Sequence, residues 1–316
     1  MNLRRHFSSQ STLKLSLGFF FASALLFFSG CQSESLTTKL THELAPFPEL
    51  IIDNGDDFVV IAHRGASGYA PENTMPAMEL AYEMSAEMIE VDVMLSRDGV
   101  PVLFHDAKVD ELTDGTGYLK DYSLVELQAL DAGSWFSEEY VGTTIPTLEE
   151  LLVWAQGKMT LNVEIKTEAF REELEQSVEP KVVALVEKYD MANQVIFSSF
   201  DYQILARLQE LAPSIPAAVL YEAVQSGRKG PIDVVNELQA DGFNCSWRQY
   251  SEQWQQLLEP SAVPVLIYTV NEAEQMAELI QRGVNGIFSD YPDVLAEVAT
   301  AELSVAEVAA AELSTP

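Results

Sequence analysis

The sequence is poor in cysteine. Only Cys31 and Cys245 occur among 316 residues, and Cys31 closes an N-terminal leader segment. With Cys31 used there, no intramolecular disulfide can form, so the fold does not belong to the disulfide-held class of small secreted domains. We expect Cys245 to be a small, buried hydrophobic side chain.

Basic residues are scarce as well. The chain has 18 Lys and Arg against 49 Asp and Glu, which gives a formal net charge of −31. So acidic a protein repels phosphate backbones, which argues against nucleic acid as a partner.

One apolar run, from Leu15 to Phe28, stands near the N terminus. It is too short for a comfortable transmembrane helix. It follows three basic residues, which is the pattern of a signal peptide. The three are Arg4, Arg5 and Lys14. We therefore predict that residues 1–30 are a signal peptide and that the protein is exported.

The end of this run resembles a bacterial lipobox. Ser29 and Gly30 precede Cys31, although Phe28 stands where leucine is usual. The resemblance implies that Cys31 carries lipid and anchors the protein to the cell envelope, in the periplasm or at the cell surface. Gln32, in place of the aspartate that retains lipoproteins in the inner membrane, favours the outer membrane. The alternative is an ordinary cleaved signal followed by an incidental cysteine.

Composition divides the remaining chain into three parts. Residues 31–55 are polar apart from a proline-containing stretch and are expected to be a tether. Residues 56–298 are long enough for one large domain with a substantial core. Residues 299–316 are rich in alanine and glutamate. The glutamates recur at a spacing that fits no helical face, so we expect a frayed helix or a disordered acidic tail.

Strand-like runs alternate with helical patterns through the domain. The predicted strands are Val59–His63, Met88–Leu95, Pro101–Phe104, Leu161–Ile165, Val195–Ser199, Ala217–Tyr221, Gly242–Cys245, Val265–Val270 and Gly286–Ser289. The predicted helices are Met75–Met84, Leu148–Ala155, Lys181–Tyr189, Gln203–Leu211, Ile232–Leu238, Glu252–Leu258 and Glu272–Gln281. Thr147 and Glu150 predict a capping box, and Gly283 predicts a helix end.

This alternation predicts a parallel α/β fold, and eight repeats predict a TIM barrel. Nine strands are predicted, one more than a TIM barrel contains, and the extra one is Pro101–Phe104. We expect it outside the barrel, because the tight turn before it joins only antiparallel neighbours.

The stretch from Glu90 to Asp106, EVDVMLSRDGVPVLFHD, combines alternation with chemistry. Its apolar residues alternate with Glu90 and Asp92, so two carboxylates share one face of a strand. If that face is buried, charge repulsion and desolvation are costly, and a cation between the carboxylates relieves both. His105 follows on the next strand. The alternative is a solvated strand face with a surface histidine.

More polar groups follow other strands. The first predicted strand ends at His63-Arg64, and the fourth, NVEIK, places Asn162, Glu164 and Lys166 on one face. The C-terminal strand ends of a TIM barrel carry the active site. Glu90, Asp92 and Glu164 offer oxygen ligands only, which suits Ca²⁺ or Mg²⁺ rather than zinc. Arg64 and Lys166 are cations suited to an anionic substrate such as a phosphodiester.

The histidines are few, and both that fall within the domain belong to this group. The chain has four, of which His6 lies in the leader and His42 in the tether. His63 and His105 both follow strands and form a pair able to share proton transfer, one as base and one as acid. The alternative for each is a hydrogen-bonded core histidine.

These segments together resemble the signature of the glycerophosphodiester phosphodiesterase family. They are HRGASGYAPENT, EVDVMLSRDGVPVLFHD and NVEIK, with SSFD, YTVN and GIFSDYPD further on, so the likeness spans about residues 60–293. It implies a TIM barrel with a small insertion after the second strand, here about residues 106–145. Tyr268 and Ser289 depart from the tryptophan and threonine that many members have.

The resemblance implies hydrolysis of a glycerophosphodiester, such as glycerophosphocholine or glycerophosphoethanolamine, to glycerol 3-phosphate and an alcohol. It implies that His63 and His105 are the acid–base pair. It further implies that Glu90, Asp92 and Glu164 hold one divalent cation, for which we favour Ca²⁺ over Mg²⁺, and that Arg64 and Lys166 bind phosphate. Three aromatic residues near strand ends are expected to contact substrate, the alternative being a place in the core. They are Phe200, Trp247 and Tyr268.

Several alternatives remain open at this point. The attacking group is either water or the glycerol 2-hydroxyl, and either histidine can be the base. Rival functions are a phospholipase D-like action on lysophospholipids, a phosphoinositide phospholipase C, and an inactive surface-anchored binding protein. A comparison of diacyl, lysolipid and deacylated substrates separates the first rival from the family reaction.

Overall fold

The computed structural model describes residues 58–261 and 263–314, with side chains as far as Val305. The predicted signal peptide, Cys31 and the predicted tether lie outside these residues. Within the described part of the chain, no helix is both long enough and apolar enough to cross a membrane.

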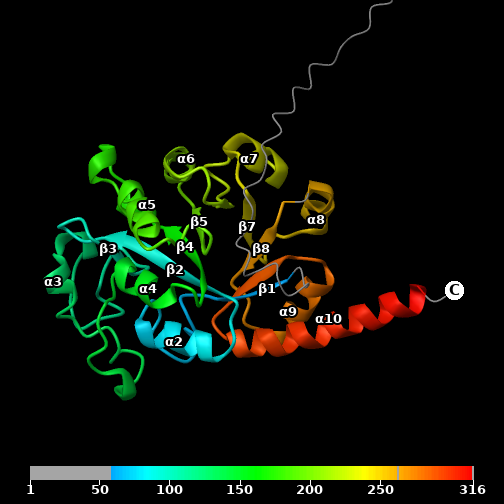
Figure 1. Cartoon of the computed structure of the whole chain (residues 1–316), viewed down its shortest axis with the longest axis horizontal. Coiled ribbons are helices and arrows are strands. Elements are labelled where there is room, and N and C mark those ends of the chain that lie inside the picture. The colour runs from blue at the N-terminus through cyan, green and yellow to red at the C-terminus, as the bar shows by residue number, and fades with distance from the viewer. Residues whose placement is uncertain (1–57, 262, 315–316) are drawn as a thin grey trace, which may run out of the picture. The chain divides into compact units, whose positions relative to one another are not determined.

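Eight parallel strands close into a barrel, which confirms the predicted TIM-barrel fold (Figure 1). The ring closes because β1 pairs in parallel with both β9 and β2. Its strands are β1 (Val59–Ala62), β2 (Met88–Leu95), β4 (Thr160–Ile165), β5 (Val195–Ser199), β6 (Ala217–Leu220), β7 (Gly242–Ser246), β8 (Val265–Tyr268) and β9 (Gly286–Ser289).

The strand β3 (Pro101–Leu103) lies outside this ring, as predicted. It runs antiparallel to the end of β2, with Leu95 opposite Pro101. The insertion that follows contains the short helices η1 (Leu119–Asp121), α3 (Leu124–Leu127) and η2 (Glu138–Tyr140). It has a small core of its own, made of Met94, Val102, Phe104, Val109, Leu119, Leu127, Ala132 and Ile145. The insertion therefore packs onto the end of β2, beside the barrel rim.

Helices surround the strands (Figure 1). They are α2 (Met75–Glu83), α4 (Leu148–Ala155), α5 (Glu179–Lys188), α6 (Tyr202–Leu211), α7 (Pro231–Leu238), α8 (Glu252–Leu258) and α9 (Ala273–Gln281), with the short helices η3 (Thr167–Ala169), η4 (Leu174–Gln176) and η5 (Glu259–Ser261). Thr147 and Glu150 form the predicted capping box of α4. Gly283 follows α9 with φ 76°, as a glycine after a helix end commonly does.

The two faces of each strand meet different surroundings. On β2, Ile89, Val91 and Val93 pack in the main core with the helices. Met88 instead joins an apolar cluster within the barrel, together with Ile61 and Ile196. Because the period of a strand is two residues, Glu90 and Asp92 follow Met88 on the inner face. Polar side chains thus gather inside the barrel toward the C-terminal ends of its strands.

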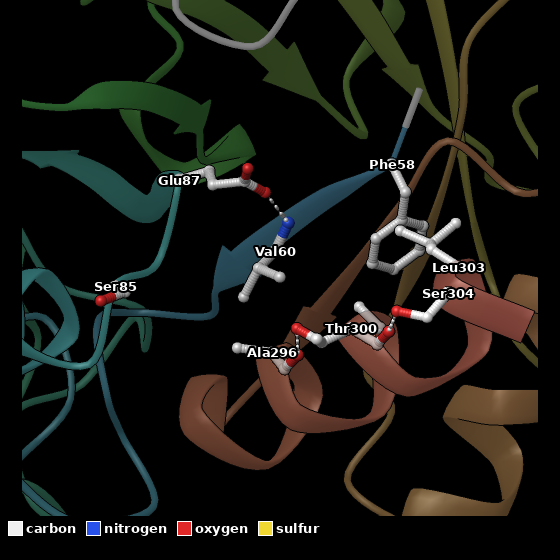
Figure 2. Close-up of a pocket in the computed structure, with 9 residues that line it drawn as sticks. Phe58, Val60, Ser85, Glu87, Ala296, Thr300, Leu303 and Ser304 are labelled. Atoms are coloured by element: carbon white, nitrogen blue, oxygen red, sulfur yellow. Dashed lines mark hydrogen bonds between the residues drawn. The ribbon is translucent and has the colours of Figure 1, made fainter. Parts of the chain in front are cut away.

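The chain after β9 forms α10 (Pro292–Ser314), so the tail continues as a helix rather than as an extended segment. Leu295 and Ala299 pack into the main core. A hollow of about 350 Å³ lies between β1, the α2–β2 connection and α10 (Figure 2). The hydroxyls of Thr300 and Ser304 there donate to carbonyls of their own helix. This hollow gathers no cluster of convergent charged groups.

Candidate active site

A cavity of about 170 Å³ lies at the C-terminal ends of the barrel strands. Residues on or just after β1, β2, β3, β4, β5, β6, β8 and β9 line it. Its polar lining consists of His63, Arg64, Glu90, His105, Asn162, Glu164, Lys166, Ser198 and Thr269, and its apolar lining of Phe200, Leu220, Tyr268 and Phe288. Six of the seven residues selected from sequence as catalytic, phosphate-binding or metal-binding line this cavity. The seventh, Asp92, lies behind the wall and contacts Arg64 and Lys166.

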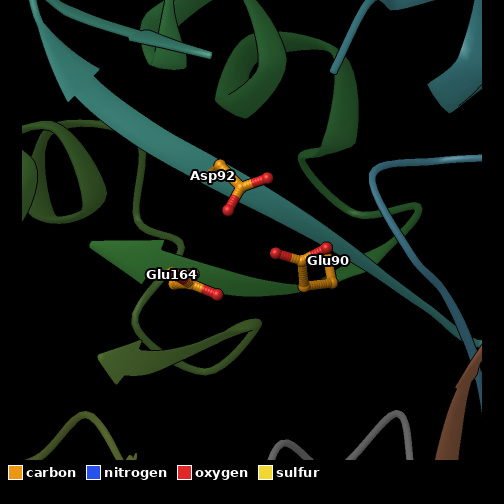
Figure 3. A group of neighbouring side chains, drawn as sticks. All are labelled: Glu90, Asp92 and Glu164. Carbon is orange, nitrogen blue, oxygen red and sulfur yellow. The ribbon is translucent and has the colours of Figure 1, made fainter. Parts of the chain in front are cut away.

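Three carboxylates converge at this rim (Figure 3). Glu90 and Asp92 stand on β2, and Glu164 stands opposite Asp92 on β4 in the sheet register. One oxygen from each lies within 4.8 Å of the others. That spacing is one that a single Ca²⁺ spans, since its oxygen ligands lie at about 2.3–2.6 Å from the ion.

Asp92 is the carboxylate that the protein itself neutralises. It is 1% exposed, and its oxygens lie 3.2 Å from Arg64 Nε and 3.1 Å from Lys166 Nζ. Asn73 Nδ2 also donates to it, at 2.9 Å. Burial acts to raise the pKa of Asp92, but the charges of Lys166 and Arg64 outweigh it and lower the pKa below its usual range. Asp92 is therefore ionised at neutral pH.

The negative charges of Glu90 and Glu164 are less well neutralised by neighbouring cations than that of Asp92. Burial, followed by the charge of Asp92, raises the pKa of Glu90 well above its ordinary value, although the Arg64 backbone N–H donates to it at 2.9 Å. The same two causes raise the pKa of Glu164 to about 7, despite a 2.7 Å contact with Lys166 Nζ. With all three carboxylates ionised, the cluster would carry more negative charge than its two cations offset, which is why the pKa values of Glu90 and Glu164 are raised. A divalent cation held by oxygen ligands fits this donor set.

The turn His63-Arg64-Gly65, which follows β1, positions Arg64. The backbone of Arg64 is left-handed, with φ 56°, a conformation that costs about 1–3 kcal/mol for a residue other than glycine. The bond to Glu90 and a 3.0 Å bond from the Asn73 N–H to the Arg64 carbonyl hold it there. Gly65 follows with φ 80°, and a Cβ on it would lie 2.6 Å from the Ala77 backbone. The turn therefore has no room for a side chain after Arg64.

Arg64 is held in place as a charged group. Its Nη1 donates to Glu72 at 2.7 Å. Burial acts to lower the pKa of Arg64, but the carboxylates of Asp92, Glu72 and Glu90 raise it above the ordinary value. Lys166 behaves alike, since Asp92 and Glu164 raise its pKa against the effect of burial. Both side chains are fixed cations facing the cavity.

Each histidine is paired with an aspartate. His63 Nδ1 lies 2.7 Å from Asp290, and His105 Nδ1 lies 2.7 Å from Asp106. Such a pairing sets the tautomer and leaves Nε2 as the reactive nitrogen. Both imidazoles line the cavity, so both can exchange protons with one bound molecule.

Asp290 is itself firmly held. Ser67 Oγ donates to it at 2.9 Å and Asn271 Nδ2 at 2.6 Å. Burial acts to raise the pKa of Asp290, and the hydrogen bond and charge of His63 lower it overall. Asp290 can therefore accept a hydrogen bond from His63 Nδ1 and fix the orientation of the imidazole. Asp106 is more exposed, at 40% of its side chain, so His105 stands at the open side of the site.

Two of the three selected aromatic residues line the cavity. The rings of Phe200 and Tyr268 meet edge to face at 5.8 Å. Burial raises the pKa of Tyr268, so its hydroxyl stays protonated. Trp247 does not line this cavity. It follows Ser246 and has the strand parity of Cys245, so it packs against the outer core, with the Arg248 guanidinium over its ring.

Several residues of the site were not selected from sequence for a role, among them Asn73, Asp290, Asn162 and Ser198. Asn73 and Asp290 lie in the PENT and GIFSDYPD segments, and their positions within the family resemblance were the only available signal. Asn162 and Ser198 face the cavity as strand residues, and the alternation of NVEIK already placed Asn162 on the face of Glu164.

Solved structures of phosphodiesterases share this barrel. One is an Oleispira antarctica phosphodiesterase in complex with the product sn-glycerol-3-phosphate, 34% identical, with a TM-score of 0.69 over 75% of this chain and 95% of that one. Another is a glycerophosphodiester phosphodiesterase from Agrobacterium tumefaciens, 27% identical, with a TM-score of 0.67 over 76% of this chain and 99% of that one. The fold and its cavity define an enzyme of the phosphoric diester hydrolase class.

Sequence comparison narrows the class. A glycerophosphodiester phosphodiesterase of Bacillus subtilis is 32% identical over 77% of this chain and 87% of its own length. One from Caldanaerobacter subterraneus is 34% identical over 75% of this chain and 96% of its own length. The model of the glycerophosphoryl diester phosphodiesterase family matches residues 63–294. The chain belongs to this family.

Proposed function

We propose that this protein hydrolyses glycerophosphodiesters, such as glycerophosphocholine or glycerophosphoethanolamine, to glycerol 3-phosphate and the free alcohol. The observation that carries the proposal is that two aspartate-paired histidines and two fixed cations line one cavity beside three carboxylates. The product bound to the Oleispira antarctica relative supports the same substrate class.

Arg64 and Lys166 bind the phosphate in this proposal. Each is already oriented by carboxylates, Arg64 by Glu72 and Lys166 by Glu164. Charges that are held in place before the reaction stabilise a developing negative charge without reorganisation. The two cations therefore favour the more highly charged transition state over the bound diester.

His63 and His105 move the protons. One Nε2 accepts the proton of the attacking oxygen as its bond to phosphorus forms. The other donates a proton to the alcohol oxygen as the bond from phosphorus to that oxygen breaks. The same two groups serve whether the attacking oxygen belongs to water or to the glycerol 2-hydroxyl, which would give a cyclic phosphate that water then opens.

Glu90, Asp92 and Glu164 would hold one divalent cation, and we favour Ca²⁺ over Mg²⁺. Ca²⁺ tolerates an irregular shell of oxygen ligands from two strands, whereas Mg²⁺ requires near-octahedral geometry. When bound, the ion would supply positive charge to the phosphate oxygens.

A second hollow of about 250 Å³ adjoins the cavity and offers room for the alcohol group. It shares His105, Glu164, Lys166 and Phe200 with the first. Its outer wall includes Asp106 and the exposed Glu168. These polar walls favour a small polar alcohol over the acyl chain of a lysophospholipid, the rival substrate.

The reaction is tested by measuring glycerol 3-phosphate released from glycerophosphocholine, with lysophosphatidylcholine as the competing substrate. We expect release from the first substrate in the presence of a divalent ion. Turnover of the lysolipid alone would instead favour the phospholipase D-like rival.

We further propose that the protein is lipid-anchored to the cell envelope through Cys31. The support is the leader sequence alone, since Cys31 lies outside the described residues. We expect Cys31→Ala protein to carry no lipid and to leave the membrane fraction, while wild-type protein stays in it. Metabolic labelling with a fatty acid and membrane fractionation measure this. An unlabelled wild-type protein, or a Cys31→Ala protein that still sediments with membranes, would contradict the anchor.

A further inference from the structure

We infer that Asn162 recognises the glycerol moiety of the substrate by a hydrogen bond from its amide to a glycerol hydroxyl. The inference rests on the proposed function and assigns one end of the cavity to one part of the substrate.

The amide of Asn162 has one bonded end and one free end. Asn162 is 0% exposed, and its Oδ1 accepts a hydrogen bond of 2.6 Å from Ser198 Oγ. Its Nδ2 is buried and has no hydrogen-bond partner among the described residues. Buried donors without a partner are rare in native proteins and call for an explanation. Because Asn162 lines the cavity, a bound molecule can supply the missing acceptor.

The position of Asn162 selects which part of the substrate it meets. On the inner face of β4 it precedes Glu164 by one strand repeat, so it lies deeper in the barrel than the rim where Lys166 stands. The cations and histidines hold the phosphate at that rim. The group that reaches Asn162 is therefore the one that extends inward from the phosphate.

The cavity walls at the level of Asn162 fit a small substrate group that is the same in every substrate. Ser198, Leu220 and Phe288 line the cavity and are each less than 5% exposed. The adjoining hollow, in contrast, ends at the exposed Thr167 and Glu168. Glycerol is the part that glycerophosphodiesters share, and the alcohol is the part that varies. The closed end therefore suits glycerol, and the open hollow suits the alcohol.

The hydrogen-bonding groups around Asn162 favour a hydroxyl over a phosphate oxygen. Asn162 stands directly opposite Glu90 in the register of β2 and β4, so carboxyl oxygens lie at the same level. A hydroxyl can accept from the amide and donate to such an oxygen, whereas an ionised phosphate oxygen can only accept.

The chain offers a matched control in Asn244. This residue of β7 is also 0% exposed, and neither end of its amide has a hydrogen-bond partner in the part of the chain that the structure describes. It does not line the cavity. Asn244→Ala therefore removes a buried barrel amide without touching the proposed glycerol contact.

The test compares Asn162→Ala with wild type on glycerophosphocholine and on analogues that lack the 1-hydroxyl, the 2-hydroxyl or both. We expect kcat/KM of the variant to fall at least about tenfold on glycerophosphocholine, because sites built to bond a hydroxyl discriminate strongly against its loss. On the analogue that lacks the recognised hydroxyl, variant and wild type should agree within about threefold. Asn244→Ala should change all substrates alike. An equal loss by Asn162→Ala on every substrate would overturn the inference.

A binding measurement decides the inference without turnover. Glycerol 3-phosphate should raise the melting temperature of wild type more than that of Asn162→Ala, while inorganic phosphate should raise both equally. Ser198→Ala should show the same pattern more weakly, and it serves if Asn162→Ala does not fold. Equal responses to glycerol 3-phosphate would reject the contact. Absence of hydrolysis in wild type, with this binding difference intact, would reject only the proposed reaction.

Discussion

Replacing His63 or His105 by alanine is expected to lower the turnover number for glycerophosphocholine by about 10²–10⁴-fold each, the range typical of acid–base groups. The structure supplies the reason, since both imidazoles line the cavity and each has an aspartate on Nδ1. The losses should not multiply fully in the double variant, because the two groups act in one reaction. Steady-state release of glycerol 3-phosphate measures them.

A companion variant, Asp290→Asn, tests the role of the aspartate that is paired with His63. It keeps His63 in place but removes the carboxylate that fixes its tautomer, so we expect turnover to fall and the pH–rate profile to change shape. The melting temperatures of His63→Ala and His105→Ala should stay near that of wild type, since the two side chains are 18% and 32% exposed. A variant of either histidine that retained near-wild-type turnover would show that the acid–base assignment is wrong.

Divalent cations are expected to stabilise the fold and to restore activity to metal-stripped protein. At about 100 times its Kd, a ligand of the native state adds about 2.7 kcal/mol, which corresponds to roughly 5–10 °C in melting temperature for a domain of this size. We expect Ca²⁺ to act more strongly than Mg²⁺, and Zn²⁺ least. Thermal melts of EDTA-treated protein titrated with each ion measure this.

The stabilisation by metal should grow as pH rises. Glu90 and Glu164 have pKa values raised in the folded, metal-free protein, that of Glu164 to about 7. The native state then binds more protons than the unfolded state above about pH 4.5, so metal-free stability falls as pH rises through 7. Metal binding displaces those protons. The melting-temperature gain from Ca²⁺ should accordingly be larger at pH 8 than at pH 5.

A pair of substitutions separates metal binding from general stability. Glu90→Gln removes one repelling charge, so its metal-free form should be at least as stable as wild type while its gain from Ca²⁺ is lost. Glu139→Gln, on the exposed helix η2, should keep the full gain. Melts and rates indifferent to every ion would contradict the metal site, and recovery with Mg²⁺ but not Ca²⁺ would contradict only the choice of ion.

The fold and most of the site could be read from strand patterns. The two-residue period placed Glu90 and Asp92 on the inner face of β2, and it placed Glu164 and Lys166 likewise on and after β4. A parallel barrel brings all C-terminal strand ends to one rim, so His63 joined them without further information. Element boundaries agree to within two residues because helix caps and glycines mark them.

Other features depend on contacts that no local pattern encodes. The partner of His63 is Asp290, at the opposite end of the domain sequence, and the pairing exists because β1 and β9 are neighbours in the closed barrel. Trp247 is a residue for which the position in the sequence was misleading. Its place near a strand end suggested a substrate contact, but it lies beyond Ser246 with outward parity and packs against the outer core. Crowding of the three carboxylates predicts that some of them have raised pKa values, as Glu90 and Glu164 do, whereas the lowered pKa of Asp92 depends on the positions of Arg64 and Lys166.

The most direct test of the account measures glycerol 3-phosphate released from glycerophosphocholine by metal-stripped protein before and after Ca²⁺ is added. The account predicts no release in EDTA, and release of glycerol 3-phosphate with free choline once Ca²⁺ is restored. Release of phosphocholine, or no product with any divalent ion, would contradict it.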